Sequence, residues 1–569
     1  MAQDGLIMFI PTTIEEVNDR GWSRLDVILV SSDTYIDSPS MGAAVIGHVL
    51  MDAGYSVGII AQPDTKSGRD ITRLGEPRLF WGVSGGSVDS LVSNYTATRK
   101  KRMSDDLTPG GRNTLRPDRA VISYANLIRR HFKNTAPIVI GGIEASLRRI
   151  AHYDFWDDNI RRSIIFDAKA DILIYGMGER SVLELAADLN AGRDFTGIPG
   201  ICYISDKKIK THVELPSFEN VAVNKDTFQE MFRLFCRNNN SVGGAGLVQR
   251  HGDRYLVHNH PAAPLSSKEL DRVYELQYER DVHPYYKKMG EVRGLETLRF
   301  SITTHRGCFG GCNYCAIAVH QGSCVTSRSE KSILREARGF TGHPSFMGII
   351  SDIGGATANM YGMRCRQMTL KGACADKRCL FPGVCPSMGI SHRRQVNLLI
   401  RIRGIPGVKK AVVASGIRHD LVMADREAGE AYLAEIVQHH VSGQIKVAPE
   451  HCAGRVLDLM ARPSIESLIS FRNLFNGMSR RFKKKQYLTY YLIAAHPGST
   501  QKDMTALKKF TRKELRLTPE QVQIFTPTPS TWSTLMYYTG MNPCTGEKIF
   551  VERNKRGKEK QKKIINPFF

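Results

Sequence analysis

The sequence predicts an α/β protein in which an N-terminal doubly wound parallel sheet is followed by an incomplete (β/α)6 barrel. Two observations carry this prediction. Between residues 20 and 200, short apolar runs rich in Val and Ile end in glycine-rich turns and precede segments with helical periodicity. From Leu298 onward, six further strand candidates alternate with helix-like segments. Strands that alternate with helices favour parallel pairing, because a parallel connection needs a crossover.

The first block opens with a β-α-β unit. Residues 25–30 and 55–60 are apolar runs typical of buried strands, and residues 41–53 between them carry helical periodicity that Gly54 ends. Further strand candidates, each running into glycine, are residues 79–84, 137–140 and 171–175. In open sheets of this kind, ligands bind at the carboxyl ends of the strands. We therefore assign residues 1–204 to an N-terminal open α/β, Rossmann-like domain.

The middle of the chain departs from this pattern. Residues 238–246 are rich in Asn and Gly, and residues 261–264 read Pro-Ala-Ala-Pro. Both stretches are typical of loops rather than of regular elements. We therefore expect residues 205–290 to form a connecting region.

The second block covers residues 291–540, with a cysteine-rich insertion at 360–390. Its strand candidates are residues 298–303, 346–351, 410–415, 444–448, 487–494 and 522–525. In parallel barrels the functional groups lie at the carboxyl ends of the strands. Residues 541–569 form a basic C-terminal tail, in which residues 553–563 hold seven basic side chains and one acidic one.

Composition excludes several classes of protein. With 569 residues, 42% hydrophobic and 24% charged, the chain is neither a disulfide-stapled mini-protein nor globally disordered. Its net charge of +23 favours polyanionic partners or anionic substrates. The apolar stretch at residues 6–10 is too short for a signal peptide, and no stretch is long enough to cross a bilayer. We therefore expect a cytoplasmic protein with no membrane contact, whose thiols stay reduced.

Cysteine is concentrated in one part of the chain. Eight of the twelve cysteines fall within 78 residues, where even spreading would place fewer than two. They are Cys308, Cys312, Cys315, Cys324, Cys365, Cys374, Cys379 and Cys385. In a reducing compartment, clustered cysteines indicate a metal site or catalysis rather than disulfides.

The first three of these cysteines form the motif Cys308-x3-Cys312-x2-Cys315 directly after a predicted strand. Two glycines between the first two cysteines allow the loop to fold tightly around one centre. Structural zinc normally takes four protein ligands, and no fourth Cys or His stands at the usual short spacing. An iron–sulfur cube held by three thiolates leaves one iron open to a small ligand.

This motif, with Tyr314 just before its last cysteine and at the first strand of a six-unit barrel, resembles that of the radical S-adenosylmethionine superfamily. The resemblance implies that Cys308, Cys312 and Cys315 bind a [4Fe-4S] cluster whose open iron chelates S-adenosylmethionine. It implies reductive cleavage of S-adenosylmethionine to a 5′-deoxyadenosyl radical. It also implies an electron donor such as flavodoxin or ferredoxin.

The resemblance extends to the turns after later strands. Residues 352–356 read Asp-Ile-Gly-Gly-Ala where the superfamily has a Gly-Gly-Glu turn that meets the methionine amino group, and Ala356 departs from that Glu. Ser415, Glu450 and His496 follow strands three, four and five, where the family contacts ribose, carboxylate and adenine. The resemblance thus implies a S-adenosylmethionine site made of Tyr314, Gly354, Gly355, Ser415, Glu450 and His496.

One branch of the superfamily is more similar still. The chain resembles the YgiQ-type radical S-adenosylmethionine proteins in several segments. They include residues 142–149 (Gly-Ile-Glu-Ala-Ser-Leu-Arg-Arg), 152–156 (His-Tyr-Asp-Phe-Trp), 444–451 (Gln-Ile-Lys-Val-Ala-Pro-Glu-His) and 536–539 (Met-Tyr-Tyr-Thr). The likeness covers about residues 20 to 550. It implies the fold and the cofactor without naming a substrate or a catalytic residue.

A second group, Cys365, Cys374, Cys379 and Cys385, lies inside the insertion. The segment has little apolar periodicity of its own, so four thiolates on a metal would explain how it folds. A second iron–sulfur cluster and a structural zinc both suit thiolates, and unligated thiols are the alternative. The remaining cysteines fit ordinary buried thiols: Cys202, Cys236, Cys324, Cys452 and Cys544.

Some radical enzymes with a doubly wound domain hold cobalamin through an Asp-x-His-x-x-Gly loop. This sequence lacks that loop, since its Asp281-Val-His283 stretch lies outside the first domain and continues to Tyr286. We therefore expect no cobalamin bound through such a histidine.

Nucleic acid is a possible further partner. Residues 99–102, 480–485 and 553–563 are basic runs that could follow a phosphate backbone, although a solvated charged face is the more usual explanation of such a run. Bases could stack on Tyr487, Tyr490 and Tyr491. Two alternative functions therefore stand beside the first: a transfer RNA-modifying radical enzyme, and a non-catalytic, zinc-stabilised nucleic-acid-binding protein. Metal content separates them, because iron with sulfide supports an enzyme and zinc alone supports the binder.

Overall fold

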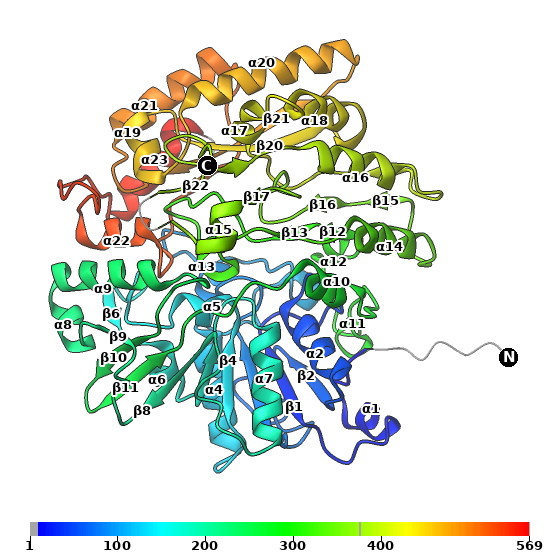
Figure 1. The fold of residues 1–569 in the computed structure, drawn as a ribbon, viewed down its shortest axis with the longest axis vertical. Helices are drawn as coiled ribbons and strands as arrows, with labels where there is room; N and C mark the ends of the chain where they lie inside the picture. Colours follow the sequence, from blue (N-terminus) through cyan, green and yellow to red (C-terminus); the bar gives the residue numbers. More distant parts are fainter. Residues whose placement is uncertain (1–8, 375–376, 568–569) are drawn as a thin grey trace. The chain divides into compact units, whose positions relative to one another are not determined.

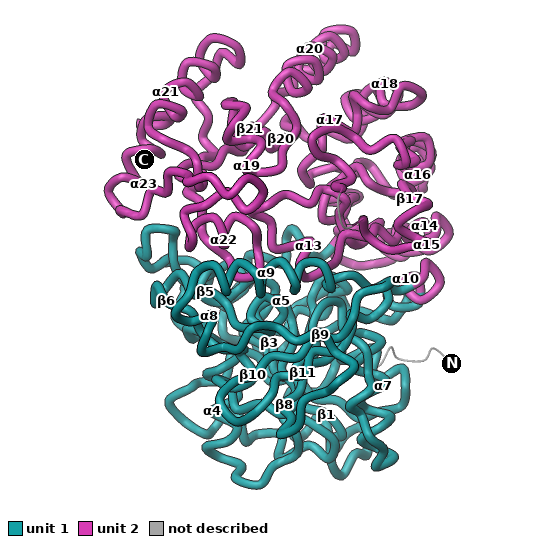
Figure 2. Tube along the Cα trace, turned by 60° about the vertical axis from the view of Figure 1, so that its left-hand side comes forward, with its two compact units in different colours: residues 1–265, 272–299 teal, residues 266–271, 300–569 magenta. Residues whose placement is uncertain are grey.

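The computed structural model describes residues 9–374 and 377–567. The chain divides into two compact units, coloured separately in Figure 2. Unit 1 consists of Met1–Leu265 and Arg272–Arg299, and unit 2 of Ser266–Asp271 and Phe300–Phe569, each counted over its described residues. None of the described helices is long and apolar enough to span a bilayer.

Unit 1 is built on a mixed sheet (Figure 1). In the described part of the chain its nine strands lie in the order β2-β1-β3-β4-β7-β8-β11-β10-β9. Their bounds are β1 Val27–Ser31, β2 Val57–Ala61, β3 Phe80–Ser84, β4 Ile138–Gly141, β7 Ile172–Ile174, β8 Ile201–Ser205, β9 Val213–Leu215, β10 Leu247–His251 and β11 Arg254–His258. Strands β2 to β7 pair in parallel, as the buried, β-branched runs predict. Strands β8, β10 and β11 join them through antiparallel pairs.

Helices precede, connect or follow these strands along the chain. They are α1 Ile14–Asp19, α2 Gly42–Asp52, α3 Ser90–Asn94, α4 Ala120–His131, α5 Gly142–Leu147, α6 Ile164–Ala168, α7 Glu179–Asn190, α8 Phe218–Val223, α9 Lys225–Asn238, α10 Ser267–Glu275, α11 Pro284–Lys287 and α12 Leu295–Leu298. The residues of α10 up to Asp271 belong to unit 2. A small hairpin, β5 His152–Asp154 with β6 Asn159–Arg161, stands apart from the main sheet. Apolar faces of α2 and α7 contribute buried residues to the core around β1 and β2.

The region expected to be a connector differs from that expectation. Strands β9, β10 and β11 extend the first sheet, and α8 and α9 precede β10. The Asn- and Gly-rich stretch at 238–246 is the turn between α9 and β10. Because these strands pair mainly with one another and with β8, their place in the sheet depends on long-range pairing rather than on local pattern.

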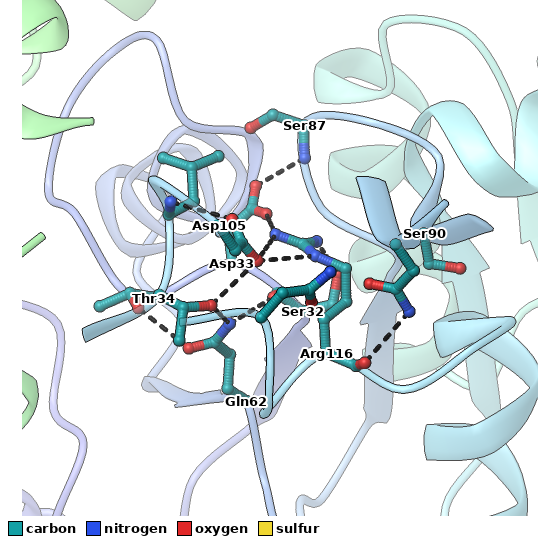
Figure 3. Close-up of polar contacts among 12 residues, drawn as sticks. Ser32, Asp33, Thr34, Gln62, Ser87, Ser90, Asp105 and Arg116 are labelled. Carbon is teal, nitrogen blue, oxygen red and sulfur yellow. Dashed lines mark hydrogen bonds and ion pairs between the residues drawn. The ribbon is translucent and has the colours of Figure 1, made fainter. Parts of the chain in front are cut away.

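A buried polar network around Arg116 lies at the carboxyl ends of β1 and β3, and Figure 3 shows its side chains. In the sheet, β1 lies between β2 and β3, so the chain crosses β1 on its way from β2 to β3. The Arg116 guanidinium donates to Asp33 Oδ1 at 2.8 Å, to Asp105 Oδ2 at 3.0 Å and to Ser32 Oγ at 2.7 Å. The Arg116 and Asp33 side chains are 1% and 2% exposed. Burial lowers the pKa of Arg116, but the two carboxylates outweigh it and raise that pKa. The carboxyl ends of β1 and β3, the usual ligand position of such sheets, thus carry a buried network of the chain's own side chains.

Unit 2 contains shorter strands. They are β12 Ser301–Thr303, β13 His305–Arg306, β14 Thr326–Ser327, β15 Ile349–Ile350, β16 Asp352–Gly354, β17 Arg364–Cys365, β18 Met388–Gly389, β19 Lys410–Ala411, β20 Gln444–Glu450, β21 Tyr487–Ala494 and β22 Val522–Ile524. Parallel pairs join β12 to β16, β15 to β19, β20 to β21 and β21 to β22. A parallel bridge between Ile417 and Val447 links the third segment to the fourth. Successive strand segments therefore pair in chain order.

Helices alternate with these strands (Figure 1). They are α13 Ile317–Gln321, α14 Glu330–Thr341, α15 Arg366–Lys371, α16 Arg393–Arg403, α17 His419–Ala424, α18 Gly429–Glu435, α19 Gly454–Met460, α20 Ile465–Arg481, α21 Gln501–Phe510, α22 Trp532–Thr539 and α23 Lys555–Ile565. The largest core of the unit lies between helices α14, α16, α18 and α20 and the strands β12 to β21.

The basic tail forms helix α23, which packs against α21 and β22. Ile565 is buried in an apolar cluster with Leu492 and Met504, and Gln561 is fully buried. The Lys558 ammonium donates to the Tyr537 hydroxyl at 3.0 Å. Much of this basic run therefore belongs to the packed fold, because an apolar stripe lies on the same helix as its charges.

Candidate functional site

The cysteine motif lies on the loop between β13 and α13. Strand β13 pairs with β14 in an antiparallel hairpin that fixes the base of the loop. Added at Gly310, a Cβ would lie 3.2 Å from Cys308 Sγ and 3.5 Å from Cys312 Sγ. Gly311 adopts a φ of +57°, which favours glycine. The two glycines therefore leave the space beside the sulfur atoms open and allow the loop to turn.

Two buried guanidinium groups border this loop. Arg418 and Arg462 each place an Nη1 atom 3.5 Å from Cys312 Sγ. Burial raises the pKa of Cys312, but Arg462 and Arg418 outweigh it and hold that pKa below its ordinary value. For Cys315, burial and the neighbouring Cys312 and Cys308 sulfurs raise the pKa to about 12. The loop therefore favours a thiolate at Cys312, and binding a metal at all three thiols would release protons.

Arg418 is held in place from two sides. Its guanidinium donates to both carboxylate oxygens of Asp420, at 2.8 and 2.5 Å. The fully buried Asn359 accepts from the Arg418 backbone N at 2.8 Å and donates to its carbonyl at 3.0 Å. Arg462 donates one Nη2 bond to the Ala448 carbonyl. Among the described residues its buried Nε has no acceptor, so this cation keeps a free donor beside the loop.

Three predicted site residues lie together near the cysteine motif. The Tyr314 hydroxyl donates to Glu450 Oε1 at 2.8 Å. The Tyr314 and His496 rings are arranged edge to face, with their centroids 6.3 Å apart. Glu450 ends β20 with a φ of +69°, which is strained for a residue with a side chain. Burial raises the pKa of Glu450, although Arg462 and Tyr314 oppose this effect.

His496 is a neutral, fully buried group. Its Nδ1 lies 2.8 Å from the Pro497 carbonyl, which only accepts, so Nδ1 carries the proton and Nε2 accepts from Ser533 Oγ at 2.7 Å. Burial lowers the pKa of His496 to about 3. Both ring nitrogens are thus engaged within the protein, and the ring packs against Tyr314 and Phe525.

The other three predicted residues form a separate group. The Ser415 hydroxyl donates to Asp352, which also accepts from the Ser415 backbone N at 3.1 Å. A Cβ at Gly354 would lie 3.2 Å from the Ser415 Cβ. The Thr357 hydroxyl, just beyond this turn, lies 3.5 Å from Cys308 Sγ. This turn therefore borders the cysteine loop at Cys308.

Gly355 has a packing role in this turn. A Cβ there would lie 2.7 Å from the His305 carbonyl oxygen and 2.8 Å from the His305 ring. We expect Gly355→Val to lower the free energy of unfolding by about 1–3 kcal/mol, because overpacked sites force backbone shifts. Urea unfolding of the metal-free protein measures this. Gly416→Ala is the control, since no described atom lies within 4 Å of its added Cβ. Equal unfolding free energies for the two variants would contradict the packing role.

The second cysteine group lies in the insertion after β16. Cys365 is buried, and Cys374, Cys379 and Cys385 are partly buried. Within residues 9–374 and 377–567, no three or more His, Cys, Asp or Glu side chains are gathered as ligands of a single metal ion. Of the cysteines expected to be ordinary buried thiols, Cys202 is buried, Cys236, Cys324 and Cys452 are partly buried, and Cys544 is exposed. The prediction for Cys544 is wrong because it lies in an exposed turn after α22.

Three residues of this site were missed by sequence reasoning. Arg418 stands three positions past Ser415 at the end of a predicted strand, which is a usable signal. Arg462 follows α19 and carries no local signal. Gln561 of α23 accepts from the Ala495 backbone N and donates to the Ser499 carbonyl, both at 3.0 Å. It thereby fixes the turn that carries His496 from 65 positions away in sequence.

Comparison with known proteins places the chain in a family. A family model described as Radical SAM N-terminal matches residues 9–301, and a domain of unknown function, DUF3362, matches residues 520–566. A UPF0313 protein of Fusobacterium nucleatum is 52% identical, with 98% of each chain covered. A UPF0313 protein of Thermotoga neapolitana is 47% identical over 98% of each chain. One of Methanosarcina mazei is 46% identical over 97% of this chain and 93% of its own.

Solved structures share the fold at low sequence identity. The radical S-adenosylmethionine methyltransferase TsrM of Kitasatospora setae, with tryptophan and a S-adenosylmethionine analogue bound, gives a TM-score of 0.51 at 13% identity. The match covers 95% of this chain and 89% of TsrM. The cobalamin-dependent S-adenosylmethionine radical enzyme OxsB gives a TM-score of 0.50 at 12% identity, over 92% of this chain and 57% of OxsB. Family model and full-length relatives together show that the chain belongs to the YgiQ-type, UPF0313 branch of the radical S-adenosylmethionine enzymes.

Proposed function

We propose that the chain binds one [4Fe-4S] cluster through Cys308, Cys312 and Cys315 and cleaves S-adenosylmethionine reductively beside it. The observation that carries this proposal is the loop itself. Three thiols share it, Gly310 leaves space between two of the sulfurs, and two buried cations border it. When bound and reduced, such a cluster supplies one electron to the sulfonium, which yields methionine and a 5′-deoxyadenosyl radical.

The two arginines fit this role. Three thiolates and a cluster bring negative charge into a buried site, and such charge needs compensation. Arg418 and Arg462 supply it at Cys312. The free Arg462 Nε is a donor suited to an anionic group, which the methionine carboxylate provides. Hydrogen bonds to the sulfur atoms also set the reduction potential of a cluster.

The remaining predicted residues would line the S-adenosylmethionine site. Glu450 and the Tyr314 hydroxyl offer acceptors near the cysteine loop, and His496 lies beside Tyr314, where the resemblance implies a contact with adenine. Gly354 and Gly355 with Ser415 would border the methionine and ribose. The chain-order pairing of parallel strands supports a six-unit partial barrel, in which these residues lie at strand ends.

We extend the proposal neither to nucleic acid nor to cobalamin. The basic run at residues 553–563 belongs largely to the packed helix α23, and the Arg99 guanidinium donates to the Phe155 carbonyl and stacks on its ring. In unit 1 the carboxyl ends of β1 and β3 carry the buried Arg116 network. An electron donor of the flavodoxin or ferredoxin type remains part of the proposal.

Anaerobic reconstitution with iron and sulfide tests the function. With reductant and S-adenosylmethionine, we expect iron and sulfide to be bound and 5′-deoxyadenosine to form, as measured by liquid chromatography and mass spectrometry. Reactions without reductant should form none, because the cleavage consumes one electron per molecule. Protein that binds zinc alone, or that binds iron and yields no 5′-deoxyadenosine, would contradict the proposal.

A further inference from the structure

The thiols of the insertion gather at one apolar cluster. Cys365 is a buried member of that cluster, and Cys379 and Cys385 pack against it. Cys324 packs against the same cluster, but it lies on the hairpin that carries Cys308 rather than in the insertion.

The backbone of the insertion gathers these thiols. Strands β17 and β18 pair antiparallel, with Cys365 opposite Met388, so that the other three cysteines lie inside one closed loop. The Cys385 N donates to the Cys379 carbonyl at 2.8 Å, which brings these two residues together. Between α15 and β18 the described residues form turns and bends without a helix or strand. A cross-link within the loop would therefore stabilise a segment that has little regular structure.

The thiols point to a cluster rather than to one ion. A zinc ion needs its four sulfurs at about 2.3 Å, so they must converge on one point. In the described residues no three ligating side chains do so. In an iron–sulfur cube each thiolate binds its own iron, and the four sulfurs lie further apart.

The insertion also contacts the first cysteine loop. Cys365 belongs to the same apolar cluster as Phe309, which stands between Cys308 and Cys312. The Arg378 guanidinium of the insertion donates to the Gly311 carbonyl of that loop at 2.7 Å. Both contacts lie within unit 2. The two groups of thiols are thus neighbours that pack against the same apolar cluster.

We propose that Cys365, Cys374, Cys379 and Cys385 hold a second iron–sulfur cluster, through which electrons enter unit 2. The charged side chains exposed on the described part of the insertion are all basic: Arg364, Arg366, Lys371 and Lys377. This surface fits an acidic one-electron carrier protein. The carrier is oxidised by one electron and the second cluster is reduced by one, and the cleavage of one S-adenosylmethionine consumes that electron. This role as electron entry rests on the function proposed above, whereas the cluster itself does not.

A variant without the first cysteine motif tests the second cluster alone. We expect the triple variant Cys308→Ala, Cys312→Ala, Cys315→Ala to bind iron and sulfide after anaerobic reconstitution. It should also show the electron paramagnetic resonance of a reduced cluster. In that background, Cys379→Ser should lose the signal and Cys324→Ser should keep it, because Cys324 lies outside the insertion. Zinc in place of iron, no metal, or loss of the signal in Cys324→Ser would overturn the ligand assignment.

Electron entry has its own test in the otherwise unaltered protein. The double variant Arg364→Glu, Arg366→Glu should reduce the rate of 5′-deoxyadenosine formation at least tenfold with reduced ferredoxin, and leave the rate with dithionite unchanged. Dithionite is a small reductant that needs no docking surface. An unchanged rate with ferredoxin would overturn electron entry at this surface. Absence of 5′-deoxyadenosine from the unaltered protein with both reductants would instead mean that the proposed function has failed.

Discussion

Cys312→Ala is expected to reduce 5′-deoxyadenosine formation to below detection and to remove the iron of the first cluster. Two thiolates would remain, and a cube loses its protein ligation with fewer than three. The variant also leaves Arg418 and Arg462 buried without the sulfur that both contact at 3.5 Å. Iron analysis, paramagnetic resonance with and without S-adenosylmethionine, and product analysis measure these losses.

Cys544→Ser is the matched control for that variant. Its thiol is exposed and far in sequence from both cysteine groups, so cluster content and product formation should be those of the unaltered protein. Because the second group of thiols would keep its own iron, total iron alone does not report on the first cluster. The decisive measurement is the paramagnetic resonance signal that changes when S-adenosylmethionine is added. Full product formation by Cys312→Ala would remove Cys312 from the site.

Arg116→Met is expected to lower the free energy of unfolding of unit 1 by about 3–5 kcal/mol. Removing one partner of a buried ion pair leaves an uncompensated charge, here on Asp33 and Asp105. Urea unfolding followed by circular dichroism measures the change. Arg272→Met removes an ion pair with Asp52 in which the Arg272 side chain is 75% exposed, and it should change stability by less than about 1 kcal/mol. Similar losses for the two variants would contradict a structural role for the Arg116 network.

The parallel strands of unit 1 could be predicted because their sequence is locally distinctive. Val27–Ser31 and Val57–Ala61 are buried on both faces, and such strands read as continuous apolar runs. Val213–Leu215 is a three-residue strand with one exposed position, which carries too little pattern to be recognised. Its pairing with Leu247–His251 depends on residues more than thirty positions away.

Spacing alone predicted only the part of the candidate site that sequence neighbours form, whereas the resemblance to the superfamily indicated Glu450 and His496, which lie beside Tyr314. Cys308, Cys312 and Cys315 share one loop, so their spacing predicts their proximity. Arg462 reaches the Cys312 sulfur from 150 positions away, and no local pattern indicates such a contact. Gly355 has a contact that its sequence did not indicate, because an added Cβ would lie 2.7 Å from the His305 carbonyl oxygen.

The contact of Gln561 with the turn at Ala495 and Ser499 has a consequence for biosynthesis. Helix α23 leaves the ribosome after every strand of unit 2, and domains fold as their segments emerge. Until then the turn that carries His496 has buried backbone groups without their partner. Nascent chains that stop before this helix would therefore expose an unfinished turn to quality-control proteases.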